Sequence, residues 1–122
     1  FKKSESAINT LEKTTNELSK ALPKAINEGR LNAKEIKQLN TDLIQLEKSF
    51  LYKEGMPFGP WYQSLYASND PYSGYASWIL PAIEYQIANS KKDQLSHWDT
   101  VYEKAILKLN EKVKAIGEKI EQ

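Results

Sequence analysis

Few side chains in this chain of 122 residues could carry out acid–base or metal chemistry. His97 is the one histidine and cysteine is absent, which leaves at most one good nitrogen or sulfur ligand for zinc and no thiol nucleophile. A Ser-His-Asp arrangement would have to use Asp93 or Asp99, which are helix neighbours of His97 rather than an assembled site. We therefore expect His97 to be structural or exposed, and a hydrolase centred on it ranks last among the functions considered.

Acidic side chains and phosphate-binding motifs give no better candidate. Glu47 beside Lys48, and Glu111 near Lys112 and Lys114, alternate in sign at helical spacing, which is typical of a solvated helix face. No glycine-rich phosphate loop is present. The net charge of +1 argues against a nucleic-acid binder, and no apolar run approaches the roughly 20 residues of a membrane span. We expect no catalysis and no cofactor in this chain taken alone.

Aromatic residues are concentrated in the middle of the chain. Ten of the thirteen lie between Phe50 and Tyr85, and Phe1 is the one that precedes them. Prolines and glycines interrupt residues 52–77, where periodicity disappears, so we expect an ordered loop rather than a regular element. So much aromatic area would not remain solvated. It can form the core of the loop, a stacking platform for sugars, or a docking surface for a partner domain.

The segment before this loop has the spacing of two amphipathic helices. Apolar residues recur every three or four positions over 8–26, and Pro23 is expected to kink this first helix or end it near Leu22. Gly29 is a suitable left-handed cap. Asn32 fits the N-cap of a second helix, whose apolar stripe continues to the edge of the aromatic region. The short link between the two helices predicts an antiparallel pair.

Two more helices are expected after the loop. A short one begins around 79–81, where Pro81 suits a first turn, and a long one begins at 93–96 with an apolar stripe from Trp98 onward. We therefore predict an all-α fold: a four-helix bundle with a long ordered aromatic-rich loop between helices 2 and 3, formed by residues 1–122 as a single domain. The stripes are expected to form the core of this bundle, and an interface with another copy is the alternative.

The order of residues in the loop is similar to that of a known family. The chain has Trp-Tyr-Gln-Ser-Leu-Tyr-Ala at 61–67, Gly-Tyr at 74–75 and Leu-Pro-Ala at 80–82. This pattern resembles the transferrin-receptor-like dimerisation domain found at the C-terminus of glutamate carboxypeptidase II and related zinc peptidases. Five positions depart from the family pattern: Gln63, Ser64, Gly74, Trp78 and Ala82.

The resemblance implies a non-catalytic module that pairs two chains as a homodimer and packs on its own peptidase domain. The zinc and the peptide substrate would belong to that peptidase domain, outside this sequence. Residues 1–122 would then be the C-terminal fragment of a larger protein, either active or inactive as a peptidase. The resemblance also favours an extracytoplasmic parent that is secreted, periplasmic or anchored in a membrane.

Two loop residues correspond to the substrate-pocket rim of the family. Tyr75 matches a tyrosine that reaches the pocket, and a phenol can donate a hydrogen bond to a carboxylate. Gly74 replaces a lysine that helps to bind glutamate substrates, so no glutamate preference is implied. The residues expected to make interdomain or dimer contacts are Phe58, Trp61, Tyr62, Tyr66, Tyr72 and Trp78. The alternative function is a carbohydrate or cell-wall binding module that uses the exposed aromatic loop.

Overall fold

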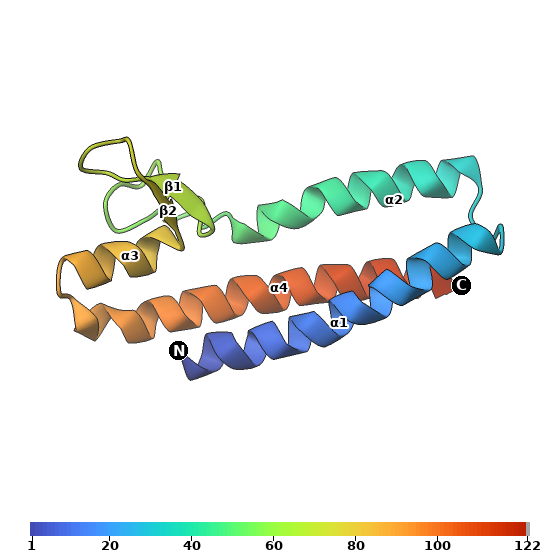
Figure 1. Cartoon of the computed structure of the whole chain (residues 1–122), viewed down its shortest axis with the longest axis horizontal. Coiled ribbons are helices and arrows are strands. Elements are labelled where there is room, and N and C mark those ends of the chain that lie inside the picture. The colour runs from blue at the N-terminus through green and yellow to red at the C-terminus, as the bar shows by residue number, and fades with distance from the viewer. Residues whose placement is uncertain (122) are drawn as a thin grey trace.

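The computed structural model describes residues 1–121 as three long helices with a small lobe at one end (Figure 1). α1 (Lys2–Asn27) and α4 (Leu95–Glu121) run parallel and in contact, and α2 (Ala33–Gln45) returns antiparallel to both. α3 (Pro81–Ala88) lies against the start of α4. The predicted all-α fold of four α-helices is confirmed for the described residues, and α3 contributes only eight residues to it.

Local sequence signals set most helix ends. The Asn32 side chain accepts a hydrogen bond from the Glu35 amide at 2.8 Å, as an N-cap does. α1 does not end near Leu22: it continues through Pro23 to Asn27. A proline removes one backbone hydrogen bond, and the helix persists because residues on both sides of it, including the fully buried Ala25, pack against α4. Beyond the helix, Gly29 adopts the predicted left-handed conformation, with φ +66°.

The lobe consists of residues 51–80, between α2 and α3. A 3-10 helix (Leu46–Phe50) leads into it, where the sequence predicted that α2 would continue. Two strands, β1 (Ala67–Asn69) and β2 (Ser77–Ile79), pair antiparallel with Ser68 opposite Trp78. The predicted loop is therefore ordered, and it contains a β-hairpin that the sequence did not predict. Strands of three residues are too short to show a period-two pattern.

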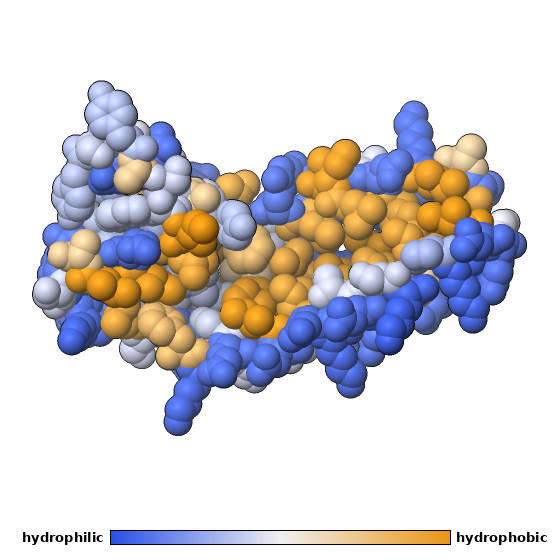
Figure 2. All heavy atoms as spheres, viewed as in Figure 1, coloured by the Kyte–Doolittle hydropathy of each residue, from blue (hydrophilic) through white to orange (hydrophobic). Residues whose placement is uncertain are grey.

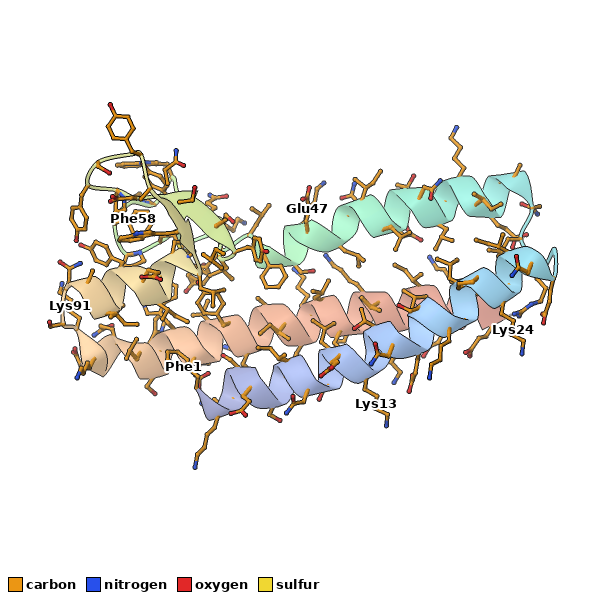
Figure 3. The ribbon with its side chains drawn as sticks, in the orientation of Figure 1. Phe1, Lys13, Lys24, Glu47, Phe58 and Lys91 are labelled. Carbon is orange, nitrogen blue, oxygen red and sulfur yellow. The ribbon has the colours of Figure 1, made fainter. Side chains whose placement is uncertain are left out.

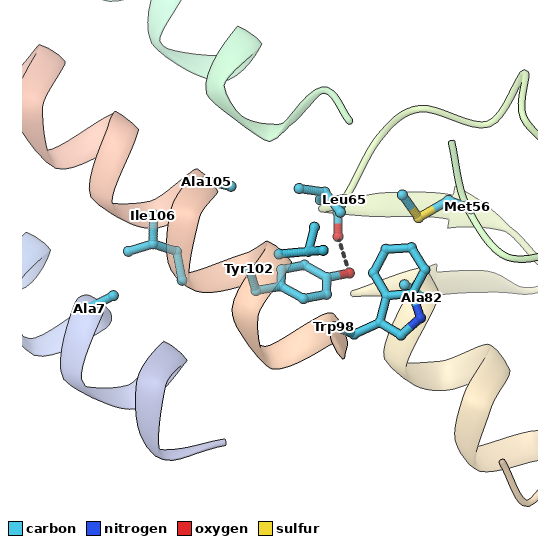
Figure 4. Close-up of a cluster of buried hydrophobic side chains, with 9 residues drawn as sticks. Ala7, Met56, Leu65, Ala82, Trp98, Tyr102, Ala105 and Ile106 are labelled. Atoms are coloured by element: carbon cyan, nitrogen blue, oxygen red, sulfur yellow. Dashed lines mark hydrogen bonds between the residues drawn. The ribbon is translucent and has the colours of Figure 1, made fainter. Parts of the chain in front are cut away.

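The buried side chains form two clusters along α4. At the lobe end, Trp98 and Tyr102 pack with Met56 and Leu65 (Figure 4). The second cluster, at the other end, joins α4 to α1 and receives partly buried leucines from α2. The predicted α4 stripe is core except at Leu109, which is only partly buried, and its buried members are these: Trp98, Tyr102, Ile106, Val113, Ile116 and Ile120.

Candidate functional site

A buried hydrogen bond fixes the lobe to the bundle. The Tyr102 hydroxyl donates to the Leu65 carbonyl oxygen at 2.7 Å, and both residues are almost completely buried (Figure 4). Burial raises the pKa of Tyr102 above its ordinary value, so the hydroxyl keeps its proton and remains a donor. Within the lobe, isolated antiparallel β-bridges pair the backbone of Leu51 with that of Ser64, and that of Met56 with that of Gly59. The lobe is therefore anchored to α4.

Phe58 is the centre of an aromatic cluster between the lobe and α3 (Figure 3). Its ring centroid lies 4.9 Å from that of Tyr62, 5.4 Å from that of Tyr85 and 6.2 Å from that of Trp78. These four side chains are partly buried against one another. Part of the aromatic surface that the sequence assigned to partner contacts is thus used within the lobe, where it keeps the loop in shape.

Four other aromatic residues of the lobe are exposed to solvent. Trp61 is 74% exposed, Tyr66 58%, Tyr72 65% and Tyr75 96%. Exposed aromatic side chains combine apolar area with polar groups, which suits them to contacts with a partner or a ligand. The predicted contact residues therefore divide into an inner group that shapes the lobe and an outer group that is open to binding.

Tyr75 lies at the tip of the β-hairpin, directly after Gly74. The Asp70 carboxylate holds this turn, because it accepts hydrogen bonds from the Ser73 hydroxyl and the Tyr72 N–H, both at 2.7 Å. The Ser73 hydroxyl, followed by the Tyr72 N–H, lowers the pKa of Asp70. Gly74 has φ +76°, in the left-handed region that favours glycine. The turn presents Tyr75 to solvent.

The described residues bring together no catalytic set. His97 is exposed, and its ring lies edge-on to that of Trp98 at 5.1 Å. Asp99 accepts hydrogen bonds from the start of α1, and Asp93 accepts one from the residue that follows it, so both carboxylates have other partners. Within residues 1–121, no three His, Cys, Asp or Glu side chains are grouped so that they could hold a metal ion. Over the same range, no helix has the length and apolar character needed to cross a bilayer.

An exposed apolar residue of α2 had no role in the sequence analysis. Ile44 on α2 is 67% exposed and belongs to none of the predicted stripes. The sequence feature that could have identified Ile44 is its position directly after Leu43. An isoleucine there makes the apolar face of α2 wider than packing on α4 requires.

An anchored aromatic lobe on a helical bundle, with exposed aromatic residues, is the architecture of an interaction domain. Residues 1–114 match the sequence profile of the transferrin receptor-like dimerisation domain, and the chain belongs to that family. The resemblance found in the loop is thereby confirmed.

The comparison with curated proteins finds a relative in Arabidopsis thaliana named "Probable glutamate carboxypeptidase LAMP1". The two sequences are 29% identical over 100 residues, which cover 77% of this chain. The match spans only 14% of the length of that relative. No solved structure gives a significant match.

Proposed function

We propose that this chain pairs two copies of a glutamate carboxypeptidase-like zinc peptidase, of which residues 1–122 form the non-catalytic C-terminal dimerisation domain. The family match over residues 1–114 is the observation that carries this proposal. The name of the plant relative supports a peptidase as the remainder of the protein. The described residues do not fit a zinc ion. Zinc is therefore assigned to the peptidase domain, and no step of its chemistry to this chain.

The exposed aromatic residues support docking of the lobe on the peptidase domain. Trp61 and Tyr72 combine a large apolar area with a polar group, which suits them to partner surfaces. Members of the cluster around Phe58 support them, because the Trp61 ring packs beside that of Tyr62 and the Tyr72 ring beside those of Trp78 and Tyr85. Little side-chain ordering is then left to occur on binding.

Tyr75 is the residue that we assign to the rim of the substrate pocket. Its phenol, 96% exposed at the hairpin tip, can donate a hydrogen bond to a carboxylate of a peptide substrate. Gly74 beside it carries no charge that would select a glutamate side chain. The role of Tyr75 is to bind and orient the substrate.

Kinetics of the full polypeptide test this assignment. Tyr75→Phe is expected to raise KM about tenfold, because a hydrogen bond to a charged group contributes about 1.5 kcal/mol, while the zinc content stays unchanged. Tyr85→Phe is the matched control, since Tyr85 lies on α3 and is not among the predicted contact residues. Unchanged kinetics of Tyr75→Phe across varied peptides would remove Tyr75 from the rim.

A carbohydrate or cell-wall binding module is the alternative, which the exposure of Trp61 favours. Titration of the chain with glycans, followed by tryptophan fluorescence, distinguishes the two functions. Dimerisation predicts no saturable change. A saturable response that disappears in Trp61→Ala would support the carbohydrate module instead.

A further inference from the structure

The lobe contains almost no charged side chains. Between Gly55 and Ile83 the sequence has a single charged residue, Asp70. Figure 2 shows the lobe mostly in pale colours, between the hydrophilic and the hydrophobic extremes seen elsewhere on the same face. Stacked rings and uncharged hydrogen bonds are therefore what the lobe offers to hold the hairpin that carries Tyr75.

Tyr72 joins the turn of this hairpin to α3. Its ring stacks on that of Tyr85 of α3, with ring centroids 6.3 Å apart and planes 18° apart, and it meets the ring of Trp78 edge-on at 6.2 Å. Its hydroxyl oxygen lies 2.7 Å from Nδ2 of Asn89, the residue that follows α3. Both the ring and the hydroxyl of Tyr72 thus contact α3 or its end.

The Tyr85 carbonyl oxygen determines how the Asn89 side chain is oriented. It accepts a hydrogen bond from Asn89 Nδ2 at 2.9 Å and another from the Asn89 backbone N–H at 3.1 Å. A carbonyl oxygen can only accept, so the side-chain atom beside it has to be the amide nitrogen. The second N–H of that nitrogen donates to the Tyr72 hydroxyl. One carboxamide thus ties the last turn of α3 to the hairpin turn.

The backbone at the end of α3 holds Asn89 in place. The Lys91 N–H donates to the Gln86 carbonyl oxygen at 2.9 Å and the Ser90 N–H to that of Ile87 at 3.1 Å, which are the two bonds of a Schellman motif. The motif needs a left-handed residue, and Ser90 adopts φ +56° although it is not glycine. These backbone bonds do not use the Asn89 side chain, so the helix end should persist when that side chain is removed.

Hydrogen bonds within the turn carry the position of Tyr72 to Tyr75. The Asp70 carboxylate binds both the Tyr72 N–H and the Ser73 hydroxyl, and the Ser73 Oγ accepts the Tyr75 N–H at 3.3 Å. The Tyr75 side chain is almost fully exposed, so it takes its position from this backbone. A change in where α3 holds Tyr72 therefore changes where Tyr75 lies.

We propose that Asn89 and Tyr72 are positioning residues: they clamp the hairpin turn to α3 and so set where Tyr75 meets a substrate carboxylate. This clamp rests on the proposed function, in which Tyr75 lies at the rim of the substrate pocket, and deepens it. When the clamp opens, the turn samples other positions, and only the fraction of molecules with Tyr75 in place binds substrate well. The clamp thereby acts on substrate binding and takes no part in the chemical step.

Kinetics of the full polypeptide with dipeptides that have a free C-terminal carboxylate test the clamp. Asn89→Ala is expected to raise KM about fivefold through the loss of one hydrogen bond, and to leave kcat, zinc content and helix content unchanged. In a Tyr75→Phe background the same change should add little, because the residue that the clamp positions no longer binds. Asn69→Ala is the matched control: Asn69 lies on β1 of the same hairpin, and its side chain is in none of the hydrogen bonds found within residues 1–121.

Hydrogen exchange of the same polypeptide, read by mass spectrometry, measures the order of the hairpin directly. Bonds across the turn protect the N–H groups of Asp70 and Gly74, at 2.7 and 2.8 Å. The hairpin should exchange about fivefold faster in Asn89→Ala and in Tyr72→Phe, which keeps the stacked ring and removes only the hydroxyl. Tyr52→Phe is the matched control, because the Tyr52 ring packs on α4 and its hydroxyl makes none of the hydrogen bonds described over the same range.

The outcomes separate the clamp from the proposed function. If Tyr75→Phe raises KM and Asn89→Ala does not, or if the two changes add independently, Tyr75 stays at the rim and the clamp is overturned. Unchanged exchange in the hairpin would overturn the clamp as well, whatever the kinetics. If Tyr75→Phe leaves KM unchanged, the rim itself is overturned and the positioning of Tyr75 with it, even where exchange shows that Asn89 orders the turn.

Discussion

At the scale of single residues, Asp99 shows how the first turn of α1 is held. Phe1 occupies the N-cap position of α1 and makes no side-chain capping bond, so the free N–H groups of the first turn need a partner from elsewhere. The Asp99 carboxylate on α4 accepts hydrogen bonds from the Ser4 N–H at 2.9 Å, the Ser4 hydroxyl at 2.6 Å and the Lys3 N–H at 3.3 Å. A negative charge at this end also interacts favourably with the helix dipole. Asp99 thus caps α1 from another helix.

Asp99→Ala is expected to lower the free energy of unfolding by about 1 to 2 kcal/mol near neutral pH, as the loss of a cap does. Desolvation alone would raise the pKa of Asp99, but hydrogen bonds from Ser4 and Lys3 lower it. A carboxylate whose pKa is lower in the folded than in the unfolded protein stabilises the fold fully above its unfolded pKa of about 4. This stabilisation is lost as the pH falls through the folded pKa.

Urea denaturation at several pH values checks this prediction. The difference between the wild type and Asp99→Ala should shrink below about pH 4. Asp93→Ala is the control, because its carboxylate accepts a hydrogen bond from the neighbouring Gln94 and touches no other element in the hydrogen bonds described. A difference that stays constant down to about pH 2 would show that the charge of Asp99 is not what holds α1.

At the scale of elements, the lobe depends on a tight turn before its first aromatic run. Gly55 has φ +83° and donates its N–H to the Tyr52 carbonyl oxygen at 3.0 Å. A Cβ at this position would lie 2.4 Å from the Cα of Pro60, closer than such atoms can approach. The turn therefore needs glycine both for its dihedral angle and for its space.

Gly55→Ala is expected to destabilise the protein by about 2 kcal/mol or more, because the left-handed conformation and the clash with Pro60 add together. Gly74→Ala is the matched control: Gly74 has φ +76°, but a Cβ there meets nothing within 4 Å, so its replacement should cost only about 1 kcal/mol. Thermal or urea unfolding measures both. Equal losses would mean that the dihedral angle alone, and not the approach of Pro60, sets the turn.

The helices were predictable because their signals are local. The apolar stripe of α4 and the cap at Asn32 are each contained within a few turns of sequence, and the structure confirms both. The β-hairpin and the contact between Ser4 and Asp99 were not, since the strands have three residues each and the contact joins positions 95 apart. Only the packing of α1 on α4 brings that pair together.

The candidate site was predictable to a smaller extent. Tyr75 could be selected from the order of residues in the loop, but its exposure depends on the hairpin and on the turn that Asp70 holds. Which of the other aromatic residues are in the cluster and which are exposed also depends on the fold. Phe58 and Trp61 are only three positions apart, yet Phe58 is in the cluster and Trp61 is exposed to solvent. No periodic pattern separates them.

At the scale of the whole molecule, stability is distributed unevenly over the three long helices. α1 and α4 contain buried residues and α2 contains none. Leu39 and Leu43 of α2 are only partly buried against the cluster at the far end of α4. The ion pair between Lys119 and Asp42, at 3.4 Å, joins α4 to α2 near the surface, where such a pair contributes about 1 kcal/mol at most. α2 is therefore the least strongly held of the three.

Native-state hydrogen exchange should detect this difference. In dilute solution, the amides of α2 are expected to exchange at least about tenfold faster than those of α4 around Ile116, because opening α2 exposes little buried surface. Equal protection of the two helices in dilute solution would contradict the prediction, because it would mean that α2 opens only when the whole domain unfolds.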